Sequence, residues 1–104
     1  MGDGGTNALS LLAQIVELSP LRHSPAGVPV ASCVLAHESR QIEAGLAREV
    51  KVTLSAVALG ELARVLAASR PGAWIAVKGF LVAKSAKSKV PVLHLNQIDF
   101  VEGN

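Results

Sequence analysis

From Leu46 to Ala56 the chain alternates between apolar and polar residues. The apolar positions share one face of an extended strand, namely Leu46, Val50, Val52, Leu54 and Ala56. The polar positions, Lys51 among them, share the other face. Because successive side chains of a strand point to opposite sides, this period of two predicts a strand with one face on a core and with Lys51 in solvent.

Four other segments have the composition of strands, at residues 9–18, 28–37, 73–83 and 90–101. In the second segment the expected inward residues are Cys33 and Leu35, and in the third they are Ile75 and Val77. The last segment is expected to carry a bulge near Asn96, where the phase of its apolar positions changes.

Residues 60–68 have the spacing of a short helix, with Leu62, Val65 and Leu66 on one side. The Pro-Gly pair that follows ends the helix. Upstream, residues 24–27 (Ser-Pro-Ala-Gly) predict a tight turn and hence a hairpin. Residues 38–45 are expected to form an exposed polar loop that contains Arg40.

The predicted protein is all-β, with five strands and a short helix between the third and the fourth. This is the order of an oligonucleotide-binding (OB) barrel, although a small β-sandwich or an SH3-like barrel has similar patterns. In an OB barrel the central strands and the loops between strands one and two and between strands four and five form the binding face. The chain has 104 residues, enough for one core, and we expect a flexible lead at 1–7 and a single domain at 8–102.

Charge is distributed unevenly along the chain. Six cations and no acid lie between residues 62 and 98, whereas the rest of the chain has four cations and eight acids, a balance of 4 − 8 = −4. Lys84, Lys87 and Lys89 lie between two predicted strands, which indicates a basic loop that follows phosphates. The alternative is a hairpin tip whose charges serve only solubility.

Other classes of function receive little support. No apolar run has the length of roughly 20 residues that spans a bilayer, so we expect no membrane segment. Cys33 is the only cysteine, which fits a reducing cytoplasm. The histidines have no metal-ligand spacing, and Cys33 and His37 lack an orienting acid, so we expect no metal, no cofactor and no enzymatic activity.

The first predicted strand is apolar on both faces, because residues of both parities between 9 and 18 are hydrophobic. One face can line the core, and the other needs a cover. A second copy of the chain is the simplest cover, so we expect a homodimer with Leu12 and Val16 in the contact.

Several short motifs resemble the primosomal replication protein N family (PriB), relatives of bacterial single-stranded DNA-binding proteins. They are Ser19-Pro-Leu-Arg22, Ser24-Pro-Ala-Gly27-Val-Pro29, Leu35-Ala-His37-Glu-Ser39, Glu43-Ala-Gly45, Val77-Lys-Gly79-Phe80, Val92-Leu-His94 and Gln97-Ile98. The resemblance implies a dimeric OB fold that acts in replication restart. It also implies binding to single-stranded DNA, to the helicase PriA and to other primosome proteins, so that the replicative helicase can be reloaded.

The family's DNA-contacting positions match this sequence in part. Arg22 aligns with a basic residue of the first hairpin, and His23 lies beside a second such position. Lys84, Lys87 and Lys89 occupy a basic loop that is shorter than the family's. Together with Arg40 and Lys51, they are the candidate nucleic-acid-binding residues. The aromatic residues that the family has on the third strand and just before it are replaced here by Lys51 and Leu46.

Aromatic side chains, the usual platforms for stacked bases, are scarce: Trp74, Phe80 and Phe100 are the only ones. We expect Phe80 and Phe100 in the core, and Trp74 partly buried. Because aromatic residues are scarce, we expect DNA binding to depend mainly on charge. A general single-stranded DNA-binding protein and a protein–protein adaptor with incidental DNA binding are the alternatives.

Overall fold

The computed structural model describes residues 4–101. The elements in chain order are β1 (Leu9–Leu18), β2 (Arg22–His23), β3 (Pro29–Glu43), β4 (Leu46–Leu59), α1 (Glu61–Ala67), β5 (Trp74–Ala83) and β6 (Pro91–Phe100). Five long strands and one short helix confirm the predicted all-β class. The first residues of the predicted lead and the last residue of the predicted domain lie outside the described residues.

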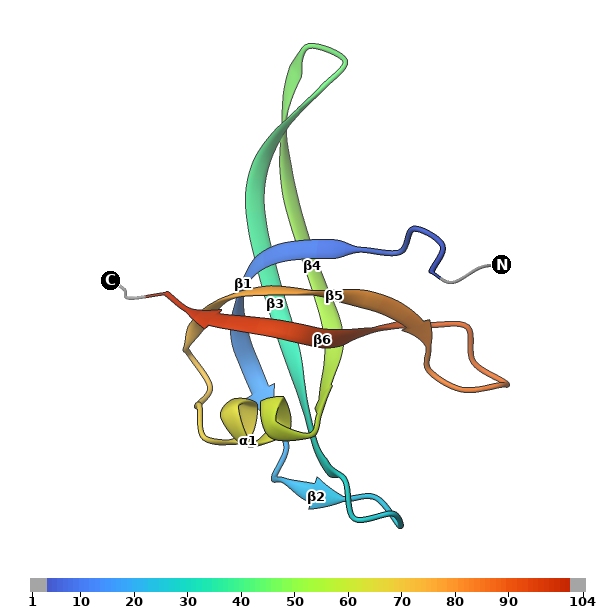
Figure 1. Cartoon of the computed structure of the whole chain (residues 1–104). Helices are drawn as coiled ribbons and strands as arrows, with labels where there is room; N and C mark the ends of the chain where they lie inside the picture. Colours follow the sequence, from blue (N-terminus) through green and yellow to red (C-terminus); the bar gives the residue numbers. More distant parts are fainter. Residues whose placement is uncertain (1–3, 102–104) are drawn as a thin grey trace.

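The five long strands close into a barrel in the order β1-β5-β6-β4-β3, and β3 pairs again with β1. All neighbours are antiparallel except β4 and β6, which run parallel where Ala56 faces Leu93. The two-residue β2 pairs with the start of β3 and forms a small hairpin outside the barrel. Figure 1 shows the closed barrel with this hairpin and α1 at one end. The OB-fold prediction is confirmed.

The core lies inside the barrel and under α1. Its largest fully buried side chains include Ile15, Leu35, Ile75 and Leu93 from four strands and Leu66 from the helix. The predicted inward residues Cys33, Leu35, Ile75 and Val77 are all buried, which confirms the strand parity read from the sequence. Within the described part of the chain, no helix is long and apolar enough to cross a membrane.

The helix α1 covers one end of the barrel with a narrower face than the sequence predicts. Ala63 and Leu66 are buried and Leu62 packs against the core. Val65, expected on the same side, is exposed. That prediction is wrong because the buried face of the short helix is centred between Ala63 and Leu66, and Val65 lies beyond the edge of that face.

The strands β3 and β4 extend well beyond the barrel as a two-stranded ribbon, here called the arm (residues 38–51), which rises from the barrel in Figure 1. The predicted loop at 38–45 is therefore wrong: β3 continues to Glu43, and Arg40 lies on a strand. The turn has only two residues, Ala44 and Gly45, both with positive φ (52° and 81°). Such a pair forms the type I′ turn that suits a twisted hairpin.

The sequence did not predict the arm. Apolar and polar residues are required to alternate along a strand only where one of its faces is buried. Both faces of the arm meet solvent, so burial imposes no alternation on its residues. For the same reason Leu46, predicted to point toward the core, is 71% exposed. Val52, at the base of the arm and also predicted to point inward, is 46% exposed, while Leu54 and Ala56 of the same face lie within the barrel.

The register between β5 and β6 shifts between Lys78 and Gly79, which leaves Asn96 without a partner residue. The predicted bulge is therefore confirmed. A side chain at Gly79 would have no space, since its Cβ would lie 2.0 Å from the carbonyl oxygen of His94. The two strands thus approach each other closely at the bulge because residue 79 is glycine.

The two phenylalanines lie on the surface, so their predicted place in the core is wrong. Phe80 is 39% and Phe100 52% exposed. Phe80 shares the outward parity of Trp74 and Lys78, and strand parity rather than hydrophobicity determines its position. Trp74 is also partly exposed.

Candidate nucleic-acid interface

The basic segment between β5 and β6 is a compact exposed loop, here called the Lys loop (residues 84–90). The backbone N–H of Lys84 donates to the carbonyl oxygen of Val90 at its base (2.9 Å). At its tip the hydroxyl of Ser85 accepts from the N–H groups of Lys87 (3.2 Å) and Ser88 (3.0 Å). Because the serine hydroxyls hold the turn, the lysine side chains are left to solvent.

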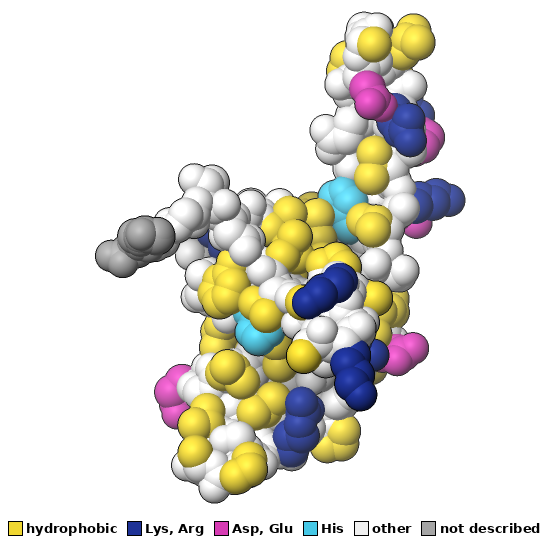
Figure 2. Space-filling view, turned by 90° about the vertical axis from the view of Figure 1, so that its right-hand side faces the viewer, with side chains coloured by type: hydrophobic (Ala, Val, Ile, Leu, Met, Phe, Trp, Pro, Cys, Tyr) yellow, Lys and Arg dark blue, Asp and Glu magenta, His cyan; other side chains and the backbone are white. Residues whose placement is uncertain are grey.

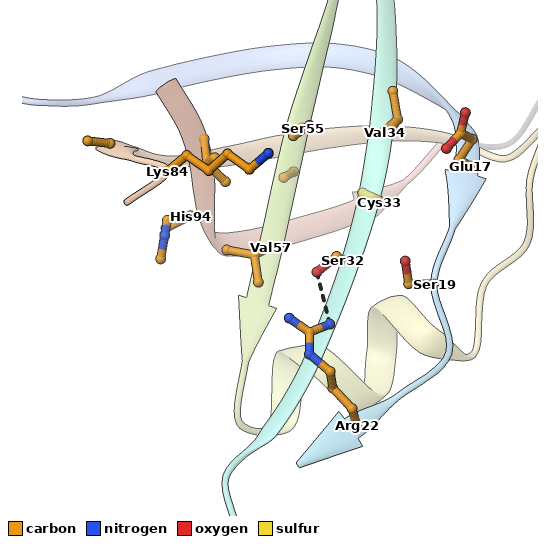
Figure 3. A pocket seen from close by; sticks show the side chains of 13 residues that line it. Glu17, Ser19, Arg22, Ser32, Cys33, Val34, Ser55, Val57, Lys84 and His94 are labelled. Carbon is orange, nitrogen blue, oxygen red and sulfur yellow. Dashed lines mark hydrogen bonds between the residues drawn. The ribbon is translucent and has the colours of Figure 1, made fainter. Parts of the chain in front are cut away.

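A groove of about 460 Å³ crosses the outer face of the sheet between the β2 hairpin and the Lys loop. Its floor is formed by Ser32, Val34, Ser55 and Val57 of β3 and β4, and its walls by Glu17, Ser19, Arg22, Lys84 and His94. Figure 3 shows Arg22 reaching in from β2 and Lys84 from the side of β5, with Glu17 at the β1 edge. Basic groups thus face a partly apolar floor from two sides.

Arg22 is held in position by the floor of the groove. Its Nη1 donates to the hydroxyl of Ser32 (3.2 Å), on the strand with which β2 pairs. This bond uses one donor of the guanidinium group and leaves the others for a ligand. His23, the neighbouring candidate, is exposed on β2 and does not line the groove.

The other two candidates, Arg40 and Lys51, lie on the arm and not in the groove. Arg40 forms an ion pair with Glu49 directly across the hairpin. Lys51 stands opposite Glu38. Their charges are therefore balanced locally, unlike those of the Lys loop, whose lysines take part in no ion pair among residues 4–101.

Sequence reasoning missed several side chains of this surface. Ser32 and Ser55 line the groove, and His94, which is not among the candidate residues, forms part of its wall. Outward parity on the two central strands was the signal that could have identified the serines. Phe80, assigned to the core, stacks on His94 beside the groove.

Leu12 and Val16, the predicted dimer residues, are 48% and 43% exposed on β1. The strand pairs with β5 through residues 9–14 and with β3 only from Gln14 onward. One edge of residues 9–13 thus lacks a partner strand within the described chain. The Nδ1–H of His37 donates to the carbonyl oxygen of Leu12 (2.7 Å).

The described residues that can ligate a metal or act as a nucleophile are either dispersed or, like Cys33, buried. Between residues 4 and 101, no three His, Cys, Asp or Glu side chains gather as metal ligands. Burial raises the pKa of the Cys33 thiol to about 11. A thiol that resists ionisation is a poor nucleophile.

Comparison with known proteins supports the fold and assigns the family. A family model described as "Another single-strand binding protein family" matches residues 7–97. The solved structure of a single-stranded DNA-binding protein from Thermus aquaticus shares the fold, with a TM-score of 0.76 and 25% identity over 95% of this chain and 52% of that one. The barrel, the groove and these matches define a protein of the single-strand binding class of OB folds.

Two further proteins narrow the assignment. Replication restart protein PriB of Bordetella pertussis is 46% identical over 99 residues, which cover 94% of this chain and 92% of the relative. The solved structure of PriB from Ralstonia solanacearum has a TM-score of 0.84 and 33% identity, covering 93% of this chain and all of that one. The chain belongs to the PriB family of replication restart proteins.

Proposed function

We propose that this chain is an accessory protein of the replication-restart primosome that binds single-stranded DNA across the groove and along the Lys loop. One observation carries the proposal: Arg22 and Lys84 face each other across an open groove that lies at the position of the OB binding face. Membership of the PriB family supports the biological setting.

The groove suits a single strand better than a duplex. Its floor carries Val34 and Val57, on which an unpaired base can rest, with serine hydroxyls beside them. Glu17 at the β1 edge repels phosphates, so the DNA backbone is expected to run on the side of Arg22 and Lys84. Contacts of this kind depend on charge and read little sequence.

The proposal includes protein partners. The chain is expected to act in the cytoplasm as a homodimer, and to bind the helicase PriA and other primosome proteins so that the replicative helicase can be reloaded. The arm is our candidate for the helicase contact, because its charges are paired and it extends away from the barrel. A protein–protein adaptor is the second candidate function, favoured by the same arm.

The DNA part of the proposal is tested by replacing Lys84, Lys87 and Lys89 together with alanine. Affinity for a labelled oligonucleotide should fall, since three phosphate contacts are lost. The slope of log K against log salt should flatten by about 0.7 per lost contact, or about 2 in total. Fluorescence anisotropy over a series of salt concentrations measures both quantities.

The arm provides a matched control. Replacing Arg40 and Glu49 together with glutamine removes an ion pair without changing net charge, and this variant should keep the slope of the parent protein. If the triple lysine variant also keeps it, the Lys loop is a solvated tip and the proposed DNA interface is wrong.

A further inference from the structure

An aromatic pair lies on the outer surface next to the groove. The rings of Phe80 and His94 are stacked, with centroids 5.6 Å apart and planes inclined by 22°. His94 also lines the groove, so the pair lies at the side of the groove that is formed by β6 and β5. Phe80 is 39% exposed, which leaves part of its ring open to solvent.

The local backbone explains why the two rings meet there. Phe80 and His94 are cross-strand partners directly after the bulge at Asn96. Gly79, immediately before Phe80, leaves space for the carbonyl oxygen of His94. Bulges of this kind redirect side chains, and the close approach brings both rings to the same outer face. The pair is therefore fixed by the sheet itself and not by a flexible loop.

The surroundings of the pair are basic. Lys78 precedes Phe80 by two residues on the same outward parity, and Lys84 follows it by four. Neither lysine has an ion-pair partner within residues 4–101. Figure 2 shows hydrophobic and basic side chains next to each other across the body of this face. An exposed ring between unpaired cations matches a nucleotide, whose base is flat and apolar and whose phosphates are anionic.

We propose that Phe80, supported by His94, is a base-stacking platform that receives a base of the single strand where it leaves the groove. The inference rests on the proposed DNA-binding function and adds a contact that charge alone does not provide. A base stacked on Phe80 places its neighbouring phosphates within the basic surroundings of Lys78 and Lys84. The platform thus takes the place of the aromatic residues that the arm lacks at Leu46 and Lys51.

The first test compares two conservative variants, Phe80→Leu and Phe100→Leu. Both residues are exposed phenylalanines of the β5–β6 pair, but Phe100 lies at the end of β6 remote from the Lys loop. Loss of stacking at Phe80 should weaken binding of an oligothymidylate roughly fivefold or more, with an unchanged salt slope. Phe100→Leu should bind as the parent protein does. Thermal melting followed by circular dichroism verifies that both variants are folded.

The second test detects the stacking of a base on residue 80 by fluorescence. Trp74 is the only tryptophan, so the double variant Trp74→Phe, Phe80→Trp carries its single indole at the platform. Its fluorescence should be quenched by an oligothymidylate but not by an abasic oligomer of the same length, which offers phosphates without bases. Binding without quenching overturns the proposal.

Other outcomes separate the possible failures. Equal oligonucleotide affinities of Phe80→Leu and Phe100→Leu, with a weakened triple lysine variant, would reject the platform and keep the proposed function. If neither Phe80 nor the lysines affect binding, both proposals fail. If Phe80→Leu changes the sedimentation coefficient, the ring belongs to a subunit contact and the platform is rejected.

Discussion

The Cys33 side chain shows how a residue's surroundings determine its chemistry. It lies in the core with 4% exposure, next to Leu35 and the other inward residues of β3. Burial disfavours the charged thiolate and raises the pKa of the thiol from 9.0 to about 11. In this site the cysteine acts as a small apolar side chain.

This shift predicts how stability depends on pH. Between pH 9 and pH 11 the unfolded chain loses the Cys33 proton while the folded chain keeps it. The free energy of unfolding should therefore fall as pH rises through this range, whereas below pH 9 the thiol should have no effect. Urea unfolding of the parent protein and of Cys33→Ala, compared at each pH, isolates this contribution because the other groups titrate in both proteins. Parallel stability curves above pH 9 would contradict the assignment.

Strand parity predicted individual residues better than hydrophobicity did. Cys33, Leu35, Ile75 and Val77 were placed correctly because one face of each strand is buried. Phe80 was placed in the core on the strength of its apolar ring, although its parity already grouped it with Lys78. The stacking of Phe80 on His94 depends on a cross-strand register that a single sequence does not contain.

At the scale of the element, the arm differs from the barrel in the way its charges are arranged. Its three acids and three bases balance, 3 − 3 = 0: Glu38, Glu43, Glu49, Arg40, Arg48 and Lys51. Two exposed ion pairs, Arg40 with Glu49 and Arg48 with Glu43, are observed. Each such pair adds only about 0–1 kcal/mol to stability. Their larger effect is to cancel the positive potential that would attract DNA.

Large apolar side chains remain exposed at the end of the arm. Ile42 and Leu46 are each 71% exposed, and they flank the Ala44–Gly45 turn on opposite faces of the ribbon. A partner protein can cover the apolar end of the arm from both sides. A single strand of DNA that is held by its phosphates does not cover apolar side chains in this way.

A double variant tests the arm as the helicase contact. Ile42→Ser with Leu46→Ser should leave oligonucleotide affinity unchanged, because neither residue lines the groove, but it should reduce stimulation of PriA unwinding severalfold. The triple lysine variant is the reciprocal control, with weakened DNA binding and an unaltered arm. If the double variant stimulates PriA as the parent protein does, the arm is not the docking element.

The sequence predicted the strands that face the core, but not the arm or the groove. The alternation at residues 46–56 placed Leu54 and Ala56 correctly, but it also pointed Leu46 and Val52 inward, and both are exposed. The alternation did not predict where β3 ends, because burial does not require a ribbon exposed on both faces to alternate apolar and polar residues. The groove combines side chains from β1 to β6, and only closure of the barrel brings Glu17, Arg22 and Lys84 together.

On the scale of the whole molecule, the acidic residues and the lysines of the Lys loop lie on different elements. The acid-free stretch of the sequence contains the Lys loop and β5, whereas four of the eight acids lie on the arm or β1. The basic side of the barrel is thus left for a polyanion. The outer face of β1, with Leu12 and Val16, carries no charge at those positions and offers a separate surface.

The open edge of β1 supports a symmetric dimer. Residues 9–13 have no partner strand on one side within the described residues, and an unpaired strand edge is a template for another chain. Pairing of β1 with its copy about a two-fold axis would join the free edges of both subunits, although the Leu12 carbonyl oxygen already accepts from His37. It would also bring Leu12 of one subunit close to Leu12 of the other.

Analytical ultracentrifugation at micromolar concentration tests this arrangement. The parent protein should sediment as a dimer, and Leu12→Glu or Val16→Glu should convert it to a monomer, because a charge buried in an apolar contact is costly. Val65→Glu is the matched control, since Val65 has a similar exposure of 41% but lies on α1, away from β1. A monomeric parent protein, or a Leu12→Glu variant that stays dimeric, would contradict the predicted contact.

Dimerisation and DNA binding should then be coupled. Two grooves on one dimer can engage one strand, so the second groove binds at a high effective concentration. The monomeric Leu12→Glu variant should therefore lose affinity for a long oligothymidylate, yet bind one that spans a single groove as the parent protein does. Equal losses for both lengths would instead mean that Leu12→Glu damages the groove itself, so the comparison separates assembly from local structure.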